Sequence, residues 1–139
     1  MYKKTITYVD FDDVERTEDF YFNLTKSELM EMDFSATGGM EKLIKNVINT
    51  QDSKRIMEIF KEIILKSYGE KSLDGKRFVK TRDGHKLADD FAETSAYDTL
   101  FMELATNDKA ATDFITGIIP KNLSTELNIS KNDPKMIIE

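Results

Sequence analysis

The stretch SKRIMEIFKEIILKSY, residues 53–68, decides the fold because it carries the clearest amphipathic pattern in the chain. Its apolar residues recur at intervals of three and four, which places them along one side of an α-helix. Asp52 or Ser53 can cap the start of this helix, and Gly69 stands where a helix commonly stops. We expect this helix at the centre of the core. Its apolar stripe consists of Ile56, Ile59, Phe60, Ile63 and Ile64.

The N-terminal residues show the alternation of β-strands instead. Residues 2–9 are rich in aromatic and β-branched side chains at a period of two, which indicates a strand. Asp10 to Asp13 supply turn-forming residues, and ERTEDFYFN then alternates again, with Phe20 and Phe22 on one face. The two segments predict a β-hairpin whose aromatic face is covered by helices, since an isolated hairpin is marginally stable in water. One face of the first strand carries Tyr2, Lys4, Ile6 and Tyr8.

Helix signals begin directly after this hairpin. Thr25 and Glu28 have the spacing of a capping box, which predicts a helix running to about Asp33. Leu24 and Leu29 fit the hydrophobic staple that accompanies such a box. A second helix is expected from Met40 to about Asn49, ahead of the helix that decides the fold.

Three further helices are expected in the C-terminal half. Leu87 and Phe91 indicate a short helix, and AYDTLFMELA and KAATDFITGII each place apolar residues on one stripe. Pro120 ends the last of them. The caps of the two longer helices are expected at Thr94 or Ser95 and at Asn107 or Asp108.

These elements together predict an α+β fold that is mainly α. We expect one globular domain over residues 1–120, with a β-hairpin in residues 1–24 packed on a bundle of five or six helices in residues 25–120. Residues 121–139 are polar with scattered aliphatics, and we interpret them as a flexible C-terminal tail.

Composition narrows the classes of function. The 139 residues carry a net charge of −6, which opposes binding to a nucleic-acid backbone. There are no cysteines, so disulfides, thiolate metal sites and a cysteine nucleophile are excluded together. The N-terminus lacks the apolar core of a signal peptide, and no run approaches the roughly 18 apolar residues of a membrane span. We expect a soluble protein that works inside a cell, without contact to nucleic acid or membrane.

The segment SYGEKSLDGKRFVKTRDGH, residues 67–85, is where catalytic chemistry would be sought. Its GEKS fragment places Glu70 where a phosphate-binding loop requires glycine. Its acidic residues do not follow the alternating pattern of a calcium loop, and His85 is the only histidine of the chain. We interpret Asp74-Gly75 and Asp83-Gly84 as turns around a short extended segment. No cofactor is expected.

The methionines leave two alternatives open. The chain has seven Met and nine Phe residues, and Met30, Met32, Met57 and Met102 lie on expected helices. Soft, adaptable side chains of this kind suit a surface that binds variable apolar helices. They also fill irregular gaps in ordinary cores, and the sequence favours this second interpretation slightly.

Three long stretches resemble a known family. ERTEDFYFNLTKSELMEM, IFKEIILKSYGEKSLDGKRFVK and AYDTLFMELATNDKAATDFITGIIP are similar to the tail assembly chaperones of siphophages and related prophages, and the resemblance spans roughly residues 1–120. It implies a non-enzymatic protein that coats the tape measure protein, a long helical ruler, until tail-tube subunits polymerise around it. The resemblance further implies residence in the host cytoplasm and absence from the mature virion.

The resemblance also widens the set of candidate partners. Besides the tape measure protein, it points to the tail tube protein, to a second copy in a homo-oligomer and to a longer form of the chain. Members of this family are often made in a longer form by a programmed ribosomal frameshift near the end of the gene. In that case residues 121–139 would end the short form.

The family supplies no agreed binding residues, so the candidate site is an inference from the sequence. An apolar groove on the chaperone could take one stripe of a ruler helix, and many weak contacts along one ruler could add up. We expect this groove on the last two helices, and the alternative is that the same side chains belong to the core. The partner-binding candidates are Leu100, Phe101, Phe114, Ile118 and Ile119.

Two other classes of function remain as alternatives. A structural tail or head–tail connector protein would stay in purified virions, whereas a chaperone would be lost from them. A small enzyme would need a site in the segment around residues 69–85, with Lys71, Asp74 and His85 as its reactive side chains.

Overall fold

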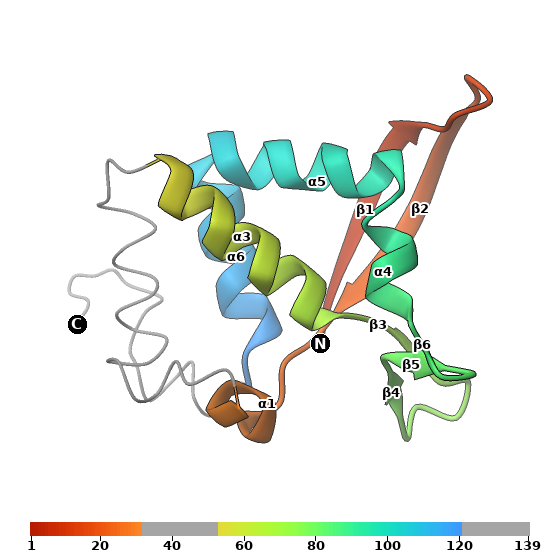
Figure 1. The fold of residues 1–139 in the computed structure, drawn as a ribbon, viewed down its shortest axis with the longest axis vertical. Helices are drawn as coiled ribbons and strands as arrows, with labels where there is room; N and C mark the ends of the chain where they lie inside the picture. Colours follow the sequence, from red (N-terminus) through yellow and green to blue (C-terminus); the bar gives the residue numbers. More distant parts are fainter. Residues whose placement is uncertain (32–52, 121–139) are drawn as a thin grey trace.

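The computed structural model describes residues 1–31 and 53–120. Four strands of one sheet, a separate two-stranded ribbon and five helices make up these residues (Figure 1). The strands are β1 (Tyr2–Val9), β2 (Glu15–Phe22), β3 (Tyr68–Lys71), β4 (Phe78–Val79), β5 (Thr81–Arg82) and β6 (His85–Lys86). The helices are α1 (Lys26–Glu31), α3 (Ser53–Ser67), α4 (Leu87–Phe91), α5 (Ser95–Thr106) and α6 (Asp108–Ile118).

The main sheet is antiparallel with the order β1-β2-β3-β4. Strands β1 and β2 pair along their full length, from Tyr2 opposite Phe22 to Val9 opposite Glu15. Strand β3 then joins the end of β2, with Phe22 opposite Tyr68, and β4 pairs with β3. The N-terminal hairpin predicted from the alternating sequence is confirmed, and its far end projects away from the helices (Figure 1).

One aspartate organises the turn of this hairpin. The Asp10 carboxylate accepts hydrogen bonds from the backbone N–H groups of Asp12 (2.8 Å) and Val14 (3.0 Å), and its second oxygen pairs with Arg16 at 2.5 Å. Asp13 adopts a left-handed backbone with φ of 63°, which aspartate tolerates better than most residues. The turn is therefore set by local polar contacts.

The core lies between the inner face of the sheet and the helices. Phe22 is fully buried, and its ring contacts those of Tyr68, Phe91 and Phe114 at centroid distances of 5.1 to 5.9 Å. Tyr68 and Phe91 stack in parallel, 4.2 Å apart. The stripe of α3 that was predicted to face inward does so at Ile59, Phe60, Ile63 and Ile64, which are all buried.

The last helix closes against the first residues of the chain. The ring of Phe114 meets Tyr2 edge-on at 5.5 Å, and the backbone N–H of Leu24 donates to the carbonyl of Ile118 at 2.8 Å. Gly117 lies so close to the Tyr2 ring that an added Cβ would approach it to 2.3 Å. Glycine is therefore required here because helix and ring are in direct contact.

Capping residues fix the helix ends much as the sequence predicts. Thr25 and Glu28 form the reciprocal capping box, at 2.9 and 3.1 Å. Thr94 caps α5 through Tyr97 N–H, and Asn107 caps α6 through Ala110 N–H. The predicted short helix is α4. The helix expected at residues 40–49, the C-terminal tail and the side chain of Ile56 lie outside the described residues.

The predicted helical bundle is wrong. The structure is α+β, but the N-terminal hairpin belongs to a four-stranded antiparallel sheet, and further strands lie within residues 25–120. Helix α3 ends at Ser67, and the next four residues form β3. Its first two residues pair with β2 and its last two with β4. The cause is the open backbone edge of β2 together with Gly69, where a Cβ would come within 2.5 Å of the Phe78 ring.

The two Asp-Gly turns predicted in residues 67–85 are confirmed. Gly75 has φ of 75°, and Asp83 and Gly84 have φ of 55° and 76°. Positive φ at both central residues is the geometry of a two-residue hairpin turn, here between β5 and β6. No helix among the described residues is long and apolar enough to cross a membrane.

Candidate partner-binding surface

Helix α3 is a ridge with a groove on each side. The α3–α5 groove, about 470 Å³ in volume, lies between α3 and the first turns of α5. The α3–α4 groove, about 610 Å³, extends from α1 across α3 to α4 and β6. Glu58 and Lys61 line both grooves, so the two share the exposed side of α3.

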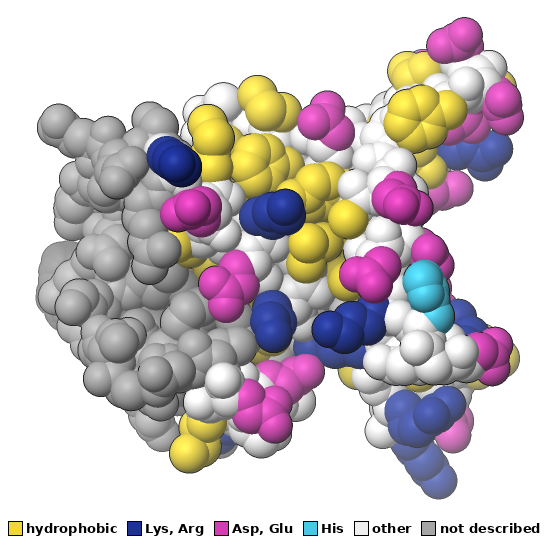
Figure 2. Space-filling model, in the orientation of Figure 1, with side chains coloured by type: hydrophobic (Ala, Val, Ile, Leu, Met, Phe, Trp, Pro, Cys, Tyr) yellow, Lys and Arg dark blue, Asp and Glu magenta, His cyan; other side chains and the backbone are white. Residues whose placement is uncertain are grey.

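The α3–α5 groove has an apolar floor. Tyr97 and Phe101 stand one turn apart on α5 with ring centroids 6.0 Å apart, and Ala92 and Met57 complete the apolar lining. Both aromatic rings are half-buried, and Met57 is 48% exposed. Figure 2 shows hydrophobic side chains gathering over α3, α4 and α5 at the centre of this face. Charged residues border the floor: Lys54, Glu58, Lys61 and Asp98.

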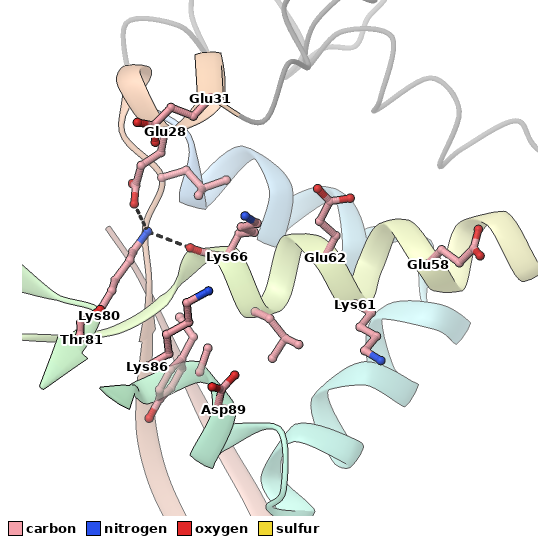
Figure 3. A pocket seen from close by; sticks show the side chains of 14 residues that line it. Glu28, Glu31, Glu58, Lys61, Glu62, Lys66, Lys80, Thr81, Lys86 and Asp89 are labelled. Atoms are coloured by element: carbon pink, nitrogen blue, oxygen red, sulfur yellow. Dashed lines mark hydrogen bonds and ion pairs between the residues drawn. The ribbon is translucent and has the colours of Figure 1, made fainter. Parts of the chain in front are cut away.

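The α3–α4 groove is more polar. Leu24, Leu65, Tyr68 and Ala88 supply apolar surface, but most other side chains that line it are charged (Figure 3). Its carboxylates are Glu28, Glu31, Glu58, Glu62 and Asp89, and its ammonium groups are Lys61, Lys66, Lys80 and Lys86.

Lys80 fixes one end of the α3–α4 groove. Its ammonium group donates to the Glu28 carboxylate at 2.6 Å and to the backbone carbonyls of Asn23 and Lys66, both at 2.8 Å (Figure 3). Burial raises the pKa of Glu28, but the hydrogen bonds from Lys80 and Thr25 outweigh it and lower that pKa overall. One amine thus ties α1, the end of β2 and the end of α3 together.

The tyrosines of both grooves are neutral at physiological pH. Burial, aided by nearby Glu70, raises the pKa of Tyr68 to about 12. Burial, and then the charge of Asp98, also raises the pKa of Tyr97. Each ring therefore presents apolar surface with one uncharged hydroxyl, which suits contact with an apolar partner more than acid–base chemistry.

Four of the five predicted partner-binding side chains are in the core. Leu100, Phe114 and Ile118 are at most 1% exposed and Ile119 is 3% exposed. Their burial agrees with the alternative that these side chains belong to the core. Phe101 alone is half-buried and lines a groove. Of the five, Phe101 is the one that a partner can reach without opening the core.

The side chains suggested for an enzyme do not line either groove. Lys71 donates to the carbonyl of Ser72, and Asp74 accepts from Ser72 and from Lys76 N–H at the β3–β4 turn. His85 lies 2.8 Å from Asp90, whose hydrogen bond raises the pKa of the imidazole. Within residues 1–31 and 53–120, no three His, Cys, Asp or Glu side chains are grouped to hold a metal ion.

Comparison with known protein families gives one result that covers nearly the whole chain. The family described as phage tail assembly chaperone matches residues 1–136. The chain belongs to this family. Comparison with curated proteins and with solved structures gives no match. The match includes most of residues 121–139, which the resemblance noted in the sequence did not cover.

Sequence reasoning missed most of the groove of this tail assembly chaperone. Met57 and Tyr97 were recognised as helical residues but not as parts of one surface. A signal was present, because Tyr97 and Phe101 are an aromatic pair at i and i+4 on one expected helix. What the sequence could not provide is the pairing of α3 with α5 that brings Met57 beside them.

Proposed function

We propose that this tail assembly chaperone binds the tape measure protein and keeps it soluble until the tail tube polymerises around it. The observation that supports this proposal is the α3–α5 groove, with its apolar floor of aromatic rings and an exposed methionine. An exposed ruler helix offers apolar stripes at intervals of three and four residues, and such a stripe fits a groove with an apolar floor and a charged border.

Adaptability is the useful property of this groove. A long ruler presents many different apolar stripes, and each copy of the chaperone must accept whichever it meets. Met57 has an unbranched, flexible side chain that can adjust to different neighbours. Weak binding by each copy would allow tube subunits to displace the chaperone, and many copies on one ruler would compensate. We place this activity in the host cytoplasm.

Co-expression with the phage's own tape measure protein tests this proposal. The chaperone should increase the soluble fraction of the ruler and co-purify with it. Met57→Lys should reduce co-purification about tenfold, because an ammonium group would be desolvated against the ruler's apolar stripe. Met30→Lys and Met102→Lys are matched controls, since both residues are exposed and neither lines a groove. If all three variants behave alike, this groove is not the binding surface.

A second measurement separates a chaperone from the structural tail or head–tail connector alternative. Mass spectrometry of purified virions should find no chain of this sequence beyond trace amounts. Stoichiometric retention in the particle would contradict the chaperone proposal and support the structural alternative. The same measurement on lysates of infected cells would show whether a longer form of the chain is made.

A further inference from the structure

Two projections of opposite charge extend from the body of the molecule. The acidic tip, residues 9–19, carries six carboxylates and one arginine. The basic arm, residues 71–86, carries six lysines or arginines and two aspartates, although the whole chain has a net charge of −6. The tip contains the turn between β1 and β2, and the arm contains the loop between β3 and β4 and the β5–β6 ribbon.

The acidic tip combines uncompensated charge with exposed apolar surface. Asp10 is paired with Arg16, whereas Asp12, Asp13 and Glu15 form no ion pair with the described residues. Phe11 is 81% exposed and Val14 is half exposed beside them. The turn holds these side chains outward because Asp10 fixes its backbone through two N–H groups.

The basic arm likewise combines unpaired charges with exposed apolar surface, but its charges are positive. Lys80 is paired with Glu28 and Arg82 with Glu70, while Lys76, Arg77 and Lys86 form no ion pair with the described residues. Leu73 is fully exposed at the end of the arm. The Asp74 carboxylate fixes this loop by accepting from Lys76 N–H and Ser72.

The two projections lie at opposite ends of one side of the molecule. In Figure 2 the acidic tip stands at the upper right and the basic arm at the lower right, with a notch between them. Within one molecule they are therefore held apart. A second copy displaced along the long axis would bring its arm next to the tip of the first copy.

We propose that the acidic tip of one copy binds the basic arm of a second copy. Charge complementarity selects the pairing, and Phe11 and Leu73 supply apolar contact at its centre. Tip and arm are different surfaces, so the contact is head-to-tail and leaves a free tip at one end and a free arm at the other. Repetition then gives an open row of copies. The α3–α5 groove takes no part in the contact and stays accessible in every copy.

The strength of the contact follows from its exposure. Ion pairs between exposed side chains contribute little individually and are screened by salt, with a Debye length of about 8 Å at physiological ionic strength. The row should therefore form reversibly and dissolve as salt is raised. A weak contact of this kind becomes effective when copies are concentrated by a shared partner.

Sedimentation velocity on the full chain tests this contact without any ruler. Self-association is expected in about 50 mM NaCl and should weaken at least about tenfold in about 500 mM NaCl. Asp12→Lys with Glu15→Lys changes the summed charge of the tip's unpaired residues, Asp12, Asp13 and Glu15, from −3 to +1. The pair leaves Asp13 in place because its positive φ disfavours lysine. Lys76→Glu with Arg77→Glu changes the summed charge of the arm's unpaired residues, Lys76, Arg77 and Lys86, from +3 to −1. The turn contacts at these two positions use backbone N–H groups and survive the change. Each double variant should lose self-association at least about tenfold.

Mixing the two double variants gives the decisive result. The tip variant keeps a wild-type arm and the arm variant keeps a wild-type tip, so these two surfaces should pair and the mixture should associate while neither variant does so alone. Lys26→Glu with Lys109→Glu is the control, since it changes total charge as the arm variant does but lies outside both projections. A monomeric wild-type chain at low salt, or a mixture that stays monomeric, overturns the proposal. Ruler binding is measured separately and is unaffected by either result.

Discussion

The β1–β2 and β3–β4 hairpins of the main sheet stabilise their turns in the same way but differ in the length of their strands. In each loop one aspartate accepts from nearby donors: Asp10 from three in the first hairpin and Asp74 from two in the second. The first hairpin pairs eight residues on each strand, whereas the second pairs two. The alternating sequence of the first hairpin is long enough to predict both of its strands. The second hairpin is too short for that, and its position depends on β2, with which β3 pairs, and on α3, which ends directly before β3. The contacts that form a turn are local, but whether the flanking residues form a strand can depend on pairing with a distant part of the chain.

Removing the anchor of the first hairpin should have the largest effect. Phe22→Ala deletes a fully buried ring that contacts three other aromatic rings, and we expect a loss of about 3–5 kcal/mol in the free energy of unfolding. Val9→Ala, at the exposed far end of the same hairpin, should change stability by less than about 0.5 kcal/mol. Urea denaturation of both variants measures the difference. Similar losses would mean that the hairpin is not anchored at Phe22.

Adding one methyl group to the second hairpin should have an intermediate effect. In Gly69→Ala the new Cβ would meet the Val79 carbonyl oxygen at 2.7 Å as well as the Phe78 ring, so β4 must move. We expect a loss of about 1–3 kcal/mol by urea denaturation. Gly75→Asn is the control in the same hairpin, because its position has open space and asparagine tolerates positive φ. A larger loss from the control would place the sensitivity in the turn instead of the strand pairing.

The two turn aspartates should have the smallest effect and a shared pH dependence. The hydrogen bond from Arg16 and then those from Val14 and Asp12 N–H lower the pKa of Asp10, and those from Lys76 N–H and Ser72 lower the pKa of Asp74. A carboxyl with a lowered folded-state pKa stabilises the fold above its ordinary value of 3.8, and this contribution is lost as pH falls through the folded pKa.

Asp10→Asn and Asp74→Asn should therefore lower Tm slightly at pH 7. The difference from wild type should vanish at the acid end of a thermal denaturation series. A variant that remains equally destabilised when the carboxyl is protonated would show that shape, and not charge, makes that aspartate important.

The parts of the fold that could be predicted from the sequence are those whose signal lies within a few consecutive residues. Capping by Thr25 and Asn107, the alternation of β1 and the stripe of α3 are such patterns, and all are confirmed. The helical bundle was wrong because β3 follows α3 without a break and consists of only four residues. Its partner lies 46 residues earlier in the chain, and no local signal announces such a pairing.

The candidate site divides in the same way. Exposed and buried apolar residues at the same helical spacing look alike in a sequence, so the predicted set mixed Phe101 with core residues such as Phe114 and Ile118. Only the packing of α3 against α5 distinguishes them. Identifying the residues that line the α3–α5 groove therefore required the structure, whereas the family could be recognised from the sequence.

The contact between Tyr2 and α6 sets an order of events during synthesis. The ribosome makes Tyr2 almost first, yet its neighbours Phe114 and Gly117 come near the end of the described fold. Until those residues leave the exit tunnel, the nascent chain carries an aromatic strand face without its final cover. The chain therefore completes its own apolar core only after nearly all of the described fold has been synthesised.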